Sequence, residues 1–97
     1  MIIVHDIFVC KPGNASKLAK MFKEAMSWSK DLTHIMTDMT GQYNRVVLVS
    51  QFENLSAYEQ NWEKMKQDPK AMEKMNQIMS GYIDMYQTGS REIFQVW

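Results

Sequence analysis

The segment RVVLVSQF, residues Arg45–Phe52, carries apolar side chains on both faces of any strand that it forms. Side chains alternate between the two faces along a strand. One face would carry Val46, Leu48 and Phe52, and the other Val47 and Val49. An antiparallel sheet with one hydrated face would instead alternate apolar and polar residues. Both faces must therefore be covered, and a chain of 97 residues supplies helices for only one of them.

Exposing the second face of this sheet to water would be costly. The segment Ile2–Cys10 repeats the pattern, with Ile3, Ile7 and Val9 on one side and Ile2, Val4, Phe8 and Cys10 on the other. Leaving about five large apolar side chains exposed, at roughly 1.5 to 3 kcal/mol each, would cost on the order of 10 kcal/mol of folding free energy. The whole stability of a domain is ~5 to 15 kcal/mol. Two sheets packed face to face across a two-fold axis cover both copies at once, so we expect a homodimer.

Length, charge and cysteine content narrow the class of protein. Ninety-seven residues make a single domain over residues 1–97. Eleven basic and eleven acidic side chains cancel without any block of like charge, which disfavours nucleic acid and anionic membranes as partners. The start of the sequence lacks the features of a signal peptide, and its apolar run is too short for a membrane span. The one cysteine, Cys10, excludes an internal disulfide, so we expect a cytoplasmic location.

The first half of the sequence predicts a strand, a helix and a hairpin. Residues 2–10 are rich in β-branched side chains, and the turn at 11–14 ends with Asn14 as the expected N-cap of a helix. The apolar face of that helix is formed by Leu18, Met21, Phe22, Ala25 and Met26. A weaker strand over residues 32–40 and the strand at 45–52 are joined by a short turn, which predicts an antiparallel hairpin.

The second half predicts a split helical region and a closing strand. Ser56 and Glu59 have the spacing of a capping box, and Asp68-Pro69 reads as the N-cap and first residue of another helix. The inward stripe of that helix is Met72, Met75, Met79, Tyr82 and Tyr86. Gly89 is expected to end it in the left-handed conformation, and residues 91–97 form the last strand.

This order, β-α-β-β-α-β, is that of the ferredoxin-like fold. The predicted class is α+β, with a four-stranded antiparallel sheet under helices on one side. With the expected second copy, the assembly is a homodimeric α/β barrel.

Three stretches of the chain resemble the dimeric α/β-barrel superfamily. They are the hairpin THIMTDMTGQYNRVVLVSQFENLSAYE, the helix start MKQDPKAMEKM and the ending TGSREIFQVW. The resemblance is to NIPSNAP proteins and antibiotic-biosynthesis monooxygenases, and is closest to uncharacterised small bacterial members. It implies the fold, whereas activities in the superfamily range from cofactor-free oxygenation to haem degradation and dehalogenation.

The haem-degrading branch of this superfamily is a poor match. Its pattern has an asparagine on the first strand, a tryptophan after the third strand, and a haem-ligating histidine about ten residues further on. Trp62 can correspond to the tryptophan, but Asp6 stands on the first strand and the histidine position falls near Met72. We therefore expect no cofactor.

The two histidines, His5 and His34, are the candidate general bases. His5 and the adjacent Asp6 point to opposite faces, whereas His34 shares a face with Asp38. Each histidine has the alternative interpretation of a hydrogen-bonded residue at a sheet edge or interface. Two separated histidines and one cysteine do not supply the converging ligands of a metal site, so no metal is expected.

The ten methionines are interpreted as core or pocket lining rather than as a copper(I) site, because their spacing along residues 72–79 is that of an inward helix face. A pocket with a methionine and aromatic lining suits a planar apolar ligand. The candidate lining residues are Trp62, Tyr58, Tyr82, Met72, Met75 and Tyr43. The alternative is that the aromatic residues only fill the core. Arg91 and Glu92 are interpreted as a salt bridge at the dimer rim, in preference to an anion clamp.

The sequence leaves three functional hypotheses open. In the first, the protein has an apolar pocket for a small aromatic molecule and acts as a cofactor-independent monooxygenase, with His34 or His5 as the base and Trp62 and Tyr82 orienting the ring. In the second, the same pocket binds a ligand without turnover. In the third, the protein is a purely structural homodimer. The sequence does not decide whether the protein is an enzyme.

Overall fold

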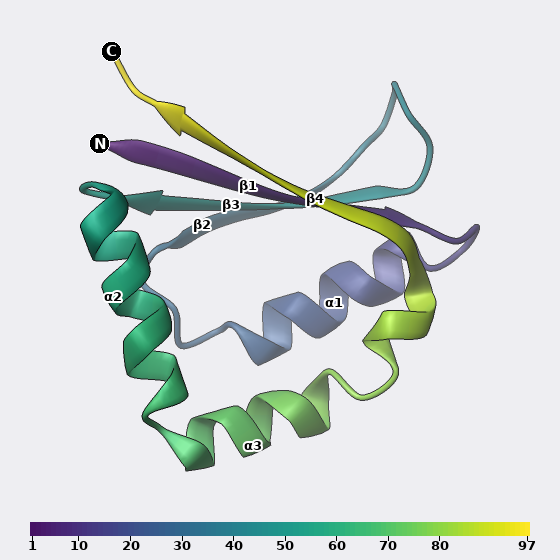
Figure 1. The fold of residues 1–97 in the computed structure, drawn as a ribbon. Coiled ribbons are helices and arrows are strands. Elements are labelled where there is room, and N and C mark those ends of the chain that lie inside the picture. The colour runs from purple at the N-terminus through teal and green to yellow at the C-terminus, as the bar shows by residue number, and fades with distance from the viewer.

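A single antiparallel sheet of four strands forms one layer of the molecule, and all the helices lie on one side of it (Figure 1). The computed structural model describes all 97 residues. The strands are β1 (Ile2–Cys10), β2 (Leu32–Thr37), β3 (Arg45–Phe52) and β4 (Tyr86–Gln95). The helices are α1 (Ala15–Ala25), α2 (Leu55–Lys66), α3 (Pro69–Ile78) and the short 3₁₀ helix η1 (Tyr82–Met85). The strand order β2-β3-β1-β4 confirms the predicted α+β, ferredoxin-like fold.

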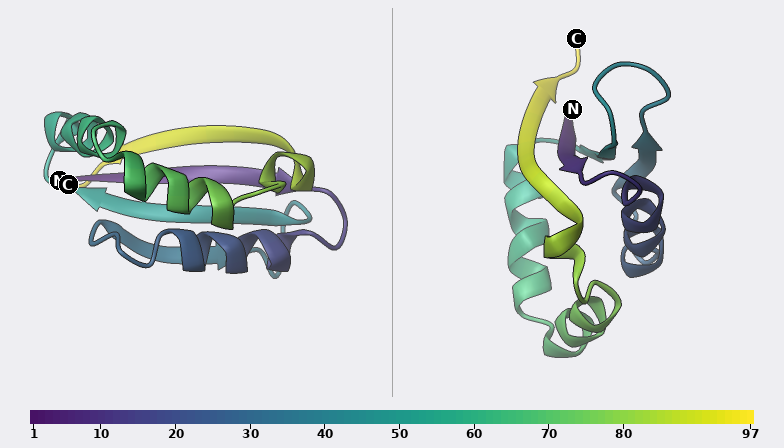
Figure 2. Two further views of the ribbon diagram at one scale, coloured as in Figure 1. Left: turned by 90° about the horizontal axis from the view of Figure 1, so that it is seen from below. Right: turned by 90° about the vertical axis from the view of Figure 1, so that its right-hand side faces the viewer.

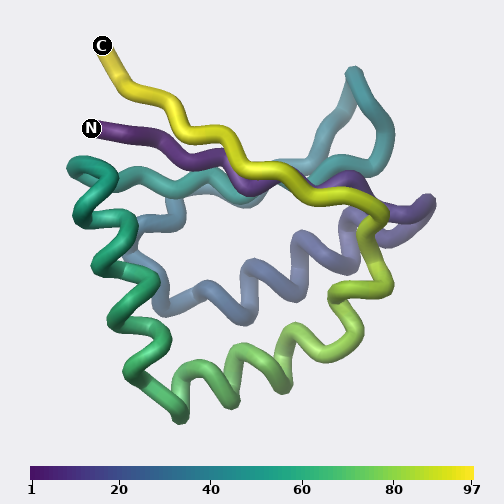
Figure 3. The backbone as a smooth tube through the Cα atoms, viewed as in Figure 1, coloured from purple at the N-terminus to yellow at the C-terminus, as the bar shows by residue number.

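The helices enclose a space beneath the sheet. Helices α1 and α3 run side by side under it, and α2 descends at the end where both termini lie (Figures 2 and 3). The termini are joined there by a hydrogen bond of 3.0 Å from the Val96 backbone N–H to the Met1 carbonyl oxygen.

The two faces of the sheet are divided as the alternation predicts. On the helix side, Val4, Val46 and Leu48 are buried beside Leu18 and Phe22 of α1. The other face, which we call the open face, has no helix over it (Figure 1). Its central side chains come from paired positions of β1, β3 and β2, namely Ile3, Ile7, Val9, Val47, Val49 and Met36. Only ten residues of the chain are buried, because the helices cover one face alone.

Two predicted helix caps differ from the observed ones. Helix α2 begins two residues before the predicted capping box, because the side chain of Asn54 accepts a hydrogen bond of 2.9 Å from the Ala57 backbone N–H. Ser56 therefore lies inside the first turn. Asn14 does precede α1, but its side chain makes no capping hydrogen bond. Asp68 caps α3 as predicted, by accepting from the Ala71 backbone N–H at 3.1 Å.

The end of the second helical region also differs from the prediction. Helix α3 stops at Ile78, and Gly81, with φ of 81°, takes the left-handed conformation that was expected at Gly89. The apolar stripe continues past this point because η1 keeps Tyr82 against the core. Strand β4 then starts at Tyr86 rather than at residue 91, and Gly89 lies within it, opposite Phe8.

Strand β2 is shorter than predicted and ends at Thr37. The loop that follows is tied at its base by Asp38. The Asp38 carboxylate accepts hydrogen bonds from the backbone N–H and from Nε of Arg45, both at 3.1 Å. Beyond this clasp the loop extends away from the sheet (Figure 1). None of the helices combines the length and the apolar composition of a membrane span.

Candidate functional site

A largely apolar cavity of about 330 Å³ lies between the sheet and the helices. Twelve of its 18 lining residues are hydrophobic. These twelve are Phe8, Phe22, Met26, Trp28, Leu48, Phe52, Tyr58, Trp62, Met65, Met75, Met79 and Tyr82. They come from the helix-side face of β1 and β3, from the inner stripes of the three α-helices, and from the segments that follow α1 and α3. This helix-side cavity has the composition of a small-molecule site.

The cavity exists because one chain segment turns away from the sheet. Helix α1 packs under β2 and β3, whereas α2 descends at one end of the sheet and α3 returns from its far tip to lie against α1, farther from the strands (Figure 1). Asp68 and Pro69 set that corner, since proline is tolerated in the first turn of a helix but cannot continue one. Trp62 and Met65 of α2 and Met75 of α3 therefore line the cavity instead of closing onto the strands.

An ion pair between Asp6 and Arg91 stands among these apolar residues. Asp6 and Arg91 face each other across β1 and β4, and Nε of Arg91 donates to Oδ1 of Asp6 at 2.5 Å. The carboxylate is the more enclosed partner, with 20% of its side chain exposed against 47% for Arg91. Burial acts to lower the pKa of Arg91, but the hydrogen bond and the charge of Asp6, with a smaller effect of the nearby Tyr58 hydroxyl, outweigh it, and the pKa is raised.

Two aromatic rings of α2 hold the Arg91 guanidinium over the cavity. The guanidinium carbon lies 5.6 Å from the centre of the Trp62 ring and 5.7 Å from that of Tyr58. These are cation–π distances. The rings of Tyr58 and Trp62 meet edge to face, as do those of Tyr58 and Phe52.

The hydroxyl of Tyr58 is the one buried side-chain polar atom without a hydrogen-bond partner in the protein. Such a group costs free energy unless it is paired, so its position among cavity-lining residues is notable. Asp6, Arg91 and this hydroxyl, together with Ser50 and Asn61, supply the polar groups of the site near β1, β3, β4 and α2.

Four of the six predicted pocket residues line the helix-side cavity: Trp62, Tyr58, Tyr82 and Met75. The other two lie outside it. Met72 is on the first turns of α3 and borders a shallow polar hollow with Pro69 and Glu73. Tyr43 is 86% exposed in the loop between β2 and β3, which extends away from the helices.

Both histidines lie on the open face, away from the helix-side cavity. His5 pairs with Val49 and Glu92 of the neighbouring strands, and its ring meets that of Phe94 edge to face at 5.2 Å. His34 is exposed on β2, with Nδ1 at 3.1 Å from Oγ1 of Thr33. The alternation of side chains along each strand puts them there, so neither can reach a ligand in that cavity.

Sequence reasoning did not identify Asp6 and Arg91 as parts of the site. The sequence predicts a salt bridge of Arg91 and Glu92 at a dimer rim, but Arg91 pairs with Asp6, and Glu92 points to the other face. A signal for Asp6 was present, since it is the one charged residue on the apolar, helix-side face of residues 2–10. A charge in that position needs a partner.

No group of three or more His, Cys, Asp or Glu side chains converges to hold a metal ion. Burial, with a smaller effect of the Asp38 charge, raises the pKa of the buried Cys10 thiol. A thiol with a raised pKa is a poor nucleophile at neutral pH.

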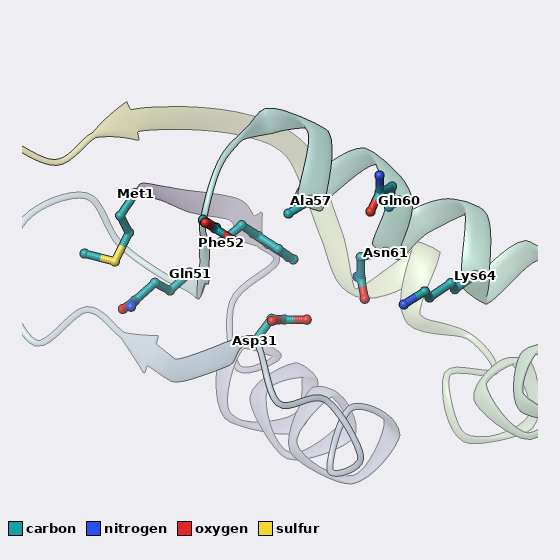
Figure 4. Close-up of a pocket in the computed structure, with 9 residues that line it drawn as sticks. Met1, Asp31, Gln51, Phe52, Ala57, Gln60, Asn61 and Lys64 are labelled. Atoms are coloured by element: carbon teal, nitrogen blue, oxygen red, sulfur yellow. The ribbon is translucent and has the colours of Figure 1, made fainter.

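A second hollow, of about 580 Å³, lies between α2, the ends of β1 and β3 and the segment before β2 (Figure 4). It is bordered by Met1, Asp31, Gln51, Phe52, Glu53, Ala57, Gln60, Asn61 and Lys64, of which only three are hydrophobic. This hollow is more open than the helix-side cavity and has few apolar groups to enclose a ligand. The helix-side cavity is therefore the stronger candidate.

Solved structures of low sequence identity share this fold. An uncharacterised NIPSNAP domain protein from Burkholderia xenovorans superposes with a TM-score of 0.80 at 14% identity, over 100% of this chain and 95% of that one. A NIPSNAP family protein from Agrobacterium tumefaciens gives 0.77 at 12%, over 97% and 90%. A putative antibiotic biosynthesis monooxygenase from Nitrosomonas europaea gives 0.63 at 9%, over 99% and 98%.

The family comparison covers most of the site. No curated protein matches the sequence. The NIPSNAP family model matches residues 6–88, a range that includes Asp6, α2 and α3 and stops short of Arg91. Because the match spans far more than half of the 97 residues, the chain belongs to the NIPSNAP family.

Proposed function

We propose that the protein binds a small, mainly apolar ring compound in the helix-side cavity. The observation that carries this proposal is the cavity itself, with twelve hydrophobic residues among 18 and a compact set of polar groups. Burial of a ring against these side chains would contribute roughly 25 cal/mol per Å² of apolar surface. Seven of the lining residues are aromatic, and they suit a flat ligand better than a flexible one.

Isothermal titration calorimetry with a panel of bicyclic compounds tests this proposal. The informative variant is Met65→Trp, because Met65 lines the cavity and a larger ring there takes up ligand volume. Met72→Trp is the matched control, since Met72 lies on α3 outside the cavity. Binding should fall at least tenfold in Met65→Trp and persist in Met72→Trp. Absence of binding to every compound, or equal loss in both variants, would contradict the proposal.

A second candidate function is oxygenation without a cofactor, and the presence of Asp6 in the cavity favours testing it. In this chemistry a deprotonated substrate itself passes an electron to oxygen, so the protein supplies a base and a dry cavity. We propose Asp6 as the base for a substrate in the helix-side cavity. His5 and His34 stay the proposed bases for a site enclosed on the open face. The fold shared with the putative monooxygenase suggests which reaction class to assay.

Oxygen consumption with a panel of polycyclic quinols distinguishes the two functions. Turnover that is lost in Asp6→Asn, but retained in the double variant His5→Ala/His34→Ala, would assign the reaction to the helix-side cavity. The reverse result would assign it to the open face. Tight binding of quinols without oxygen uptake would leave the protein as a binder.

We also propose that the protein is a homodimer joined through its open face, which together with the second sheet forms an α/β barrel. The support is the apolar strip of Ile3, Ile7, Val9, Val47 and Val49, over which no helix lies. Phe94 and Met36 extend the strip onto the two edge strands, where they are 47% and 42% exposed. Contiguous apolar surface of this kind marks a protein interface.

A further inference from the structure

The polar end of the helix-side cavity contains a hydroxyl that makes no hydrogen bond of good geometry within the protein. The Tyr58 hydroxyl is buried, its ring contacts those of Phe52 and Trp62, and the one polar side chain near enough to act on it is Arg91, whose pKa it helps to raise. Every other buried side-chain polar atom is paired. The hydroxyl is therefore available to a molecule that enters the cavity, and a ligand oxygen placed there would take the position of a water.

The guanidinium above the Tyr58 ring has hydrogen-bonding capacity to spare. Of the five N–H donors of an arginine, the Nε–H of Arg91 is the one that donates to a side chain. Arg91 is also the more exposed partner of the ion pair, so its other N–H groups can be reached from the cavity mouth. Its guanidinium carbon lies 5.7 Å from the centre of the Tyr58 ring and 5.6 Å from that of Trp62, which places it beside the hydroxyl.

The charge of this site is already balanced. Asp6 neutralises Arg91 directly, so a ligand carboxylate that reached the guanidinium would also lie close to a second carboxylate. It would lose its hydration in an apolar cavity at the same time. A neutral oxygen, such as a ketone or phenol oxygen, pairs with the Tyr58 hydroxyl without either cost.

We propose that the Tyr58 hydroxyl, with the neutral Asp6–Arg91 pair beside it, selects ring compounds that carry an uncharged hydrogen-bonding oxygen, and rejects carboxylates. Tyr58 is thus a specificity-determining residue. This inference rests on the proposed function, because it concerns the ligand of the same cavity.

Calorimetry with three matched probes tests the selection: tetralin, 1-tetralone, and tetralin-1-carboxylate. They share the bicyclic skeleton and differ in the oxygen group. The ketone should bind roughly three- to tenfold more tightly than the hydrocarbon, which is the factor for one net hydrogen bond. The carboxylate should bind no better than the hydrocarbon. In Tyr58→Phe the advantage of the ketone should disappear while the affinity for tetralin stays the same. Tyr43→Phe, which removes an exposed loop hydroxyl, is the matched control.

Thermal unfolding of the same variants without any probe gives an independent readout. Tyr58→Phe removes an unpaired buried group, so its melting temperature should equal or exceed that of the wild type. A clear decrease would show that the hydroxyl has a protein partner and would overturn the inference.

The binding outcomes separate this inference from the proposed function. If tetralin and 1-tetralone bind equally, or the carboxylate binds most tightly, the selection is wrong and the binding function stands. If the ketone keeps its advantage in Tyr58→Phe, Tyr58 is not the selecting residue. If no probe binds, the proposed function fails, and this inference fails with it.

Discussion

At the scale of single residues, the two partners of the Asp6–Arg91 pair are unequal. Arg91 is about half exposed, so it can turn to water when Asp6 is replaced, whereas the Asp6 carboxylate is enclosed near the cavity. We expect Arg91→Met to lower the free energy of unfolding by about 2 kcal/mol and Asp6→Asn by about 1 kcal/mol, values below those of fully buried pairs. Urea unfolding at neutral pH measures both. Equal losses would contradict this account.

The double variant Asp6→Leu/Arg91→Met tests whether the cost of Arg91→Met comes from the carboxylate it leaves unpaired. Replacement of an enclosed ion pair by apolar residues is often neutral or stabilising. The double variant should therefore be more stable than Arg91→Met alone, even though it carries one more substitution. A double variant that is less stable than both single variants would show that the pair itself stabilises the fold.

The clasp between Asp38 and Arg45 predicts a pH dependence. Burial alone would raise the pKa of Asp38, but the hydrogen bonds from the side chain and backbone of Arg45 outweigh it, and the pKa is lowered. A carboxyl whose pKa falls on folding stabilises the protein above its unfolded pKa, about 3.9, and loses that contribution as the pH drops further.

Asp38→Asn should therefore be less stable than the wild type at pH 7, and the difference should shrink as the pH falls below about 4. Thermal unfolding at pH 7 and pH 3 measures the difference. Glu53→Gln is the control, because Glu53 is exposed and belongs to none of the three ion pairs. A constant difference across the range would mean that the ion pair is not its source.

Residue positions within one strand could be predicted, but partners distant in the sequence could not. The alternation of residues 2–10 correctly separates His5 from Asp6. Arg91 lies 85 residues from Asp6, and only the pairing register of β1 with β4 brings them together. That register depends on where β4 begins, which the sequence pattern places five residues too late.

At the scale of elements, Gly81 has the left-handed conformation that the sequence predicts for Gly89, and Gly89 lies in β4; alanine substitution tests this difference. Gly81→Ala should lower stability by about 1 kcal/mol or more, because φ is 81° and alanine resists the left-handed conformation. Gly89→Ala should cost little, since its new Cβ would have ordinary contacts, 3.7 Å from the Ile7 oxygen and 3.8 Å from Phe8. Thermal unfolding of both variants is the measurement. A helix continuous to residue 88 would reverse the order.

The type of a helix or strand could be predicted where its hydrophobic periodicity extends over many residues. The residues at which the helices and strands begin and end were harder to predict. Strands β1 and β3 match the predicted ranges because their apolar runs end at strong turn signals. The stripe from Met72 to Tyr86 misleads, because an α-helix, a left-handed glycine and a 3₁₀ turn all keep the same side chains inward. The buried residues therefore keep the spacing of one helix, although the backbone changes from an α-helix to a 3₁₀ helix.

At the scale of the whole molecule, the fold could be predicted and the cavity only in part. The order and types of the elements restrict the topology to few arrangements, and the ferredoxin-like one follows. The cavity depends on the angle at which α2 leaves the sheet, which no local pattern encodes. The sequence pattern identifies four residues of the cavity correctly, because pockets and cores are lined by the same residue types: Trp62, Tyr58, Tyr82 and Met75. For the same reason it wrongly includes Met72, which lies outside the cavity.

The whole-molecule prediction that reaches furthest concerns the open face. Val47 lies near its centre, paired with Ile7 of β1 and Met36 of β2. If two copies pack through this face, the two-fold axis places Val47 in the interface twice. Val47→Asp would then bury two unpaired carboxylates, each at a cost of several kcal/mol, or abolish the contact.

Light scattering should give the wild type twice the chain mass of 11.4 kDa and Val47→Asp the mass of a single chain. Gln60→Asp, an exposed position on α2, is the control that should stay dimeric. Circular dichroism separates dissociation from unfolding, because a folded monomer keeps the helices that cover the other face. A wild type that remains monomeric at micromolar concentration, or a Val47→Asp variant that stays dimeric, would rule out the open face as the interface. The apolar strip of β1 and β3 would then need a different partner to cover it. Exposure of these apolar side chains to water would cost a monomer free energy on the scale estimated from the sequence.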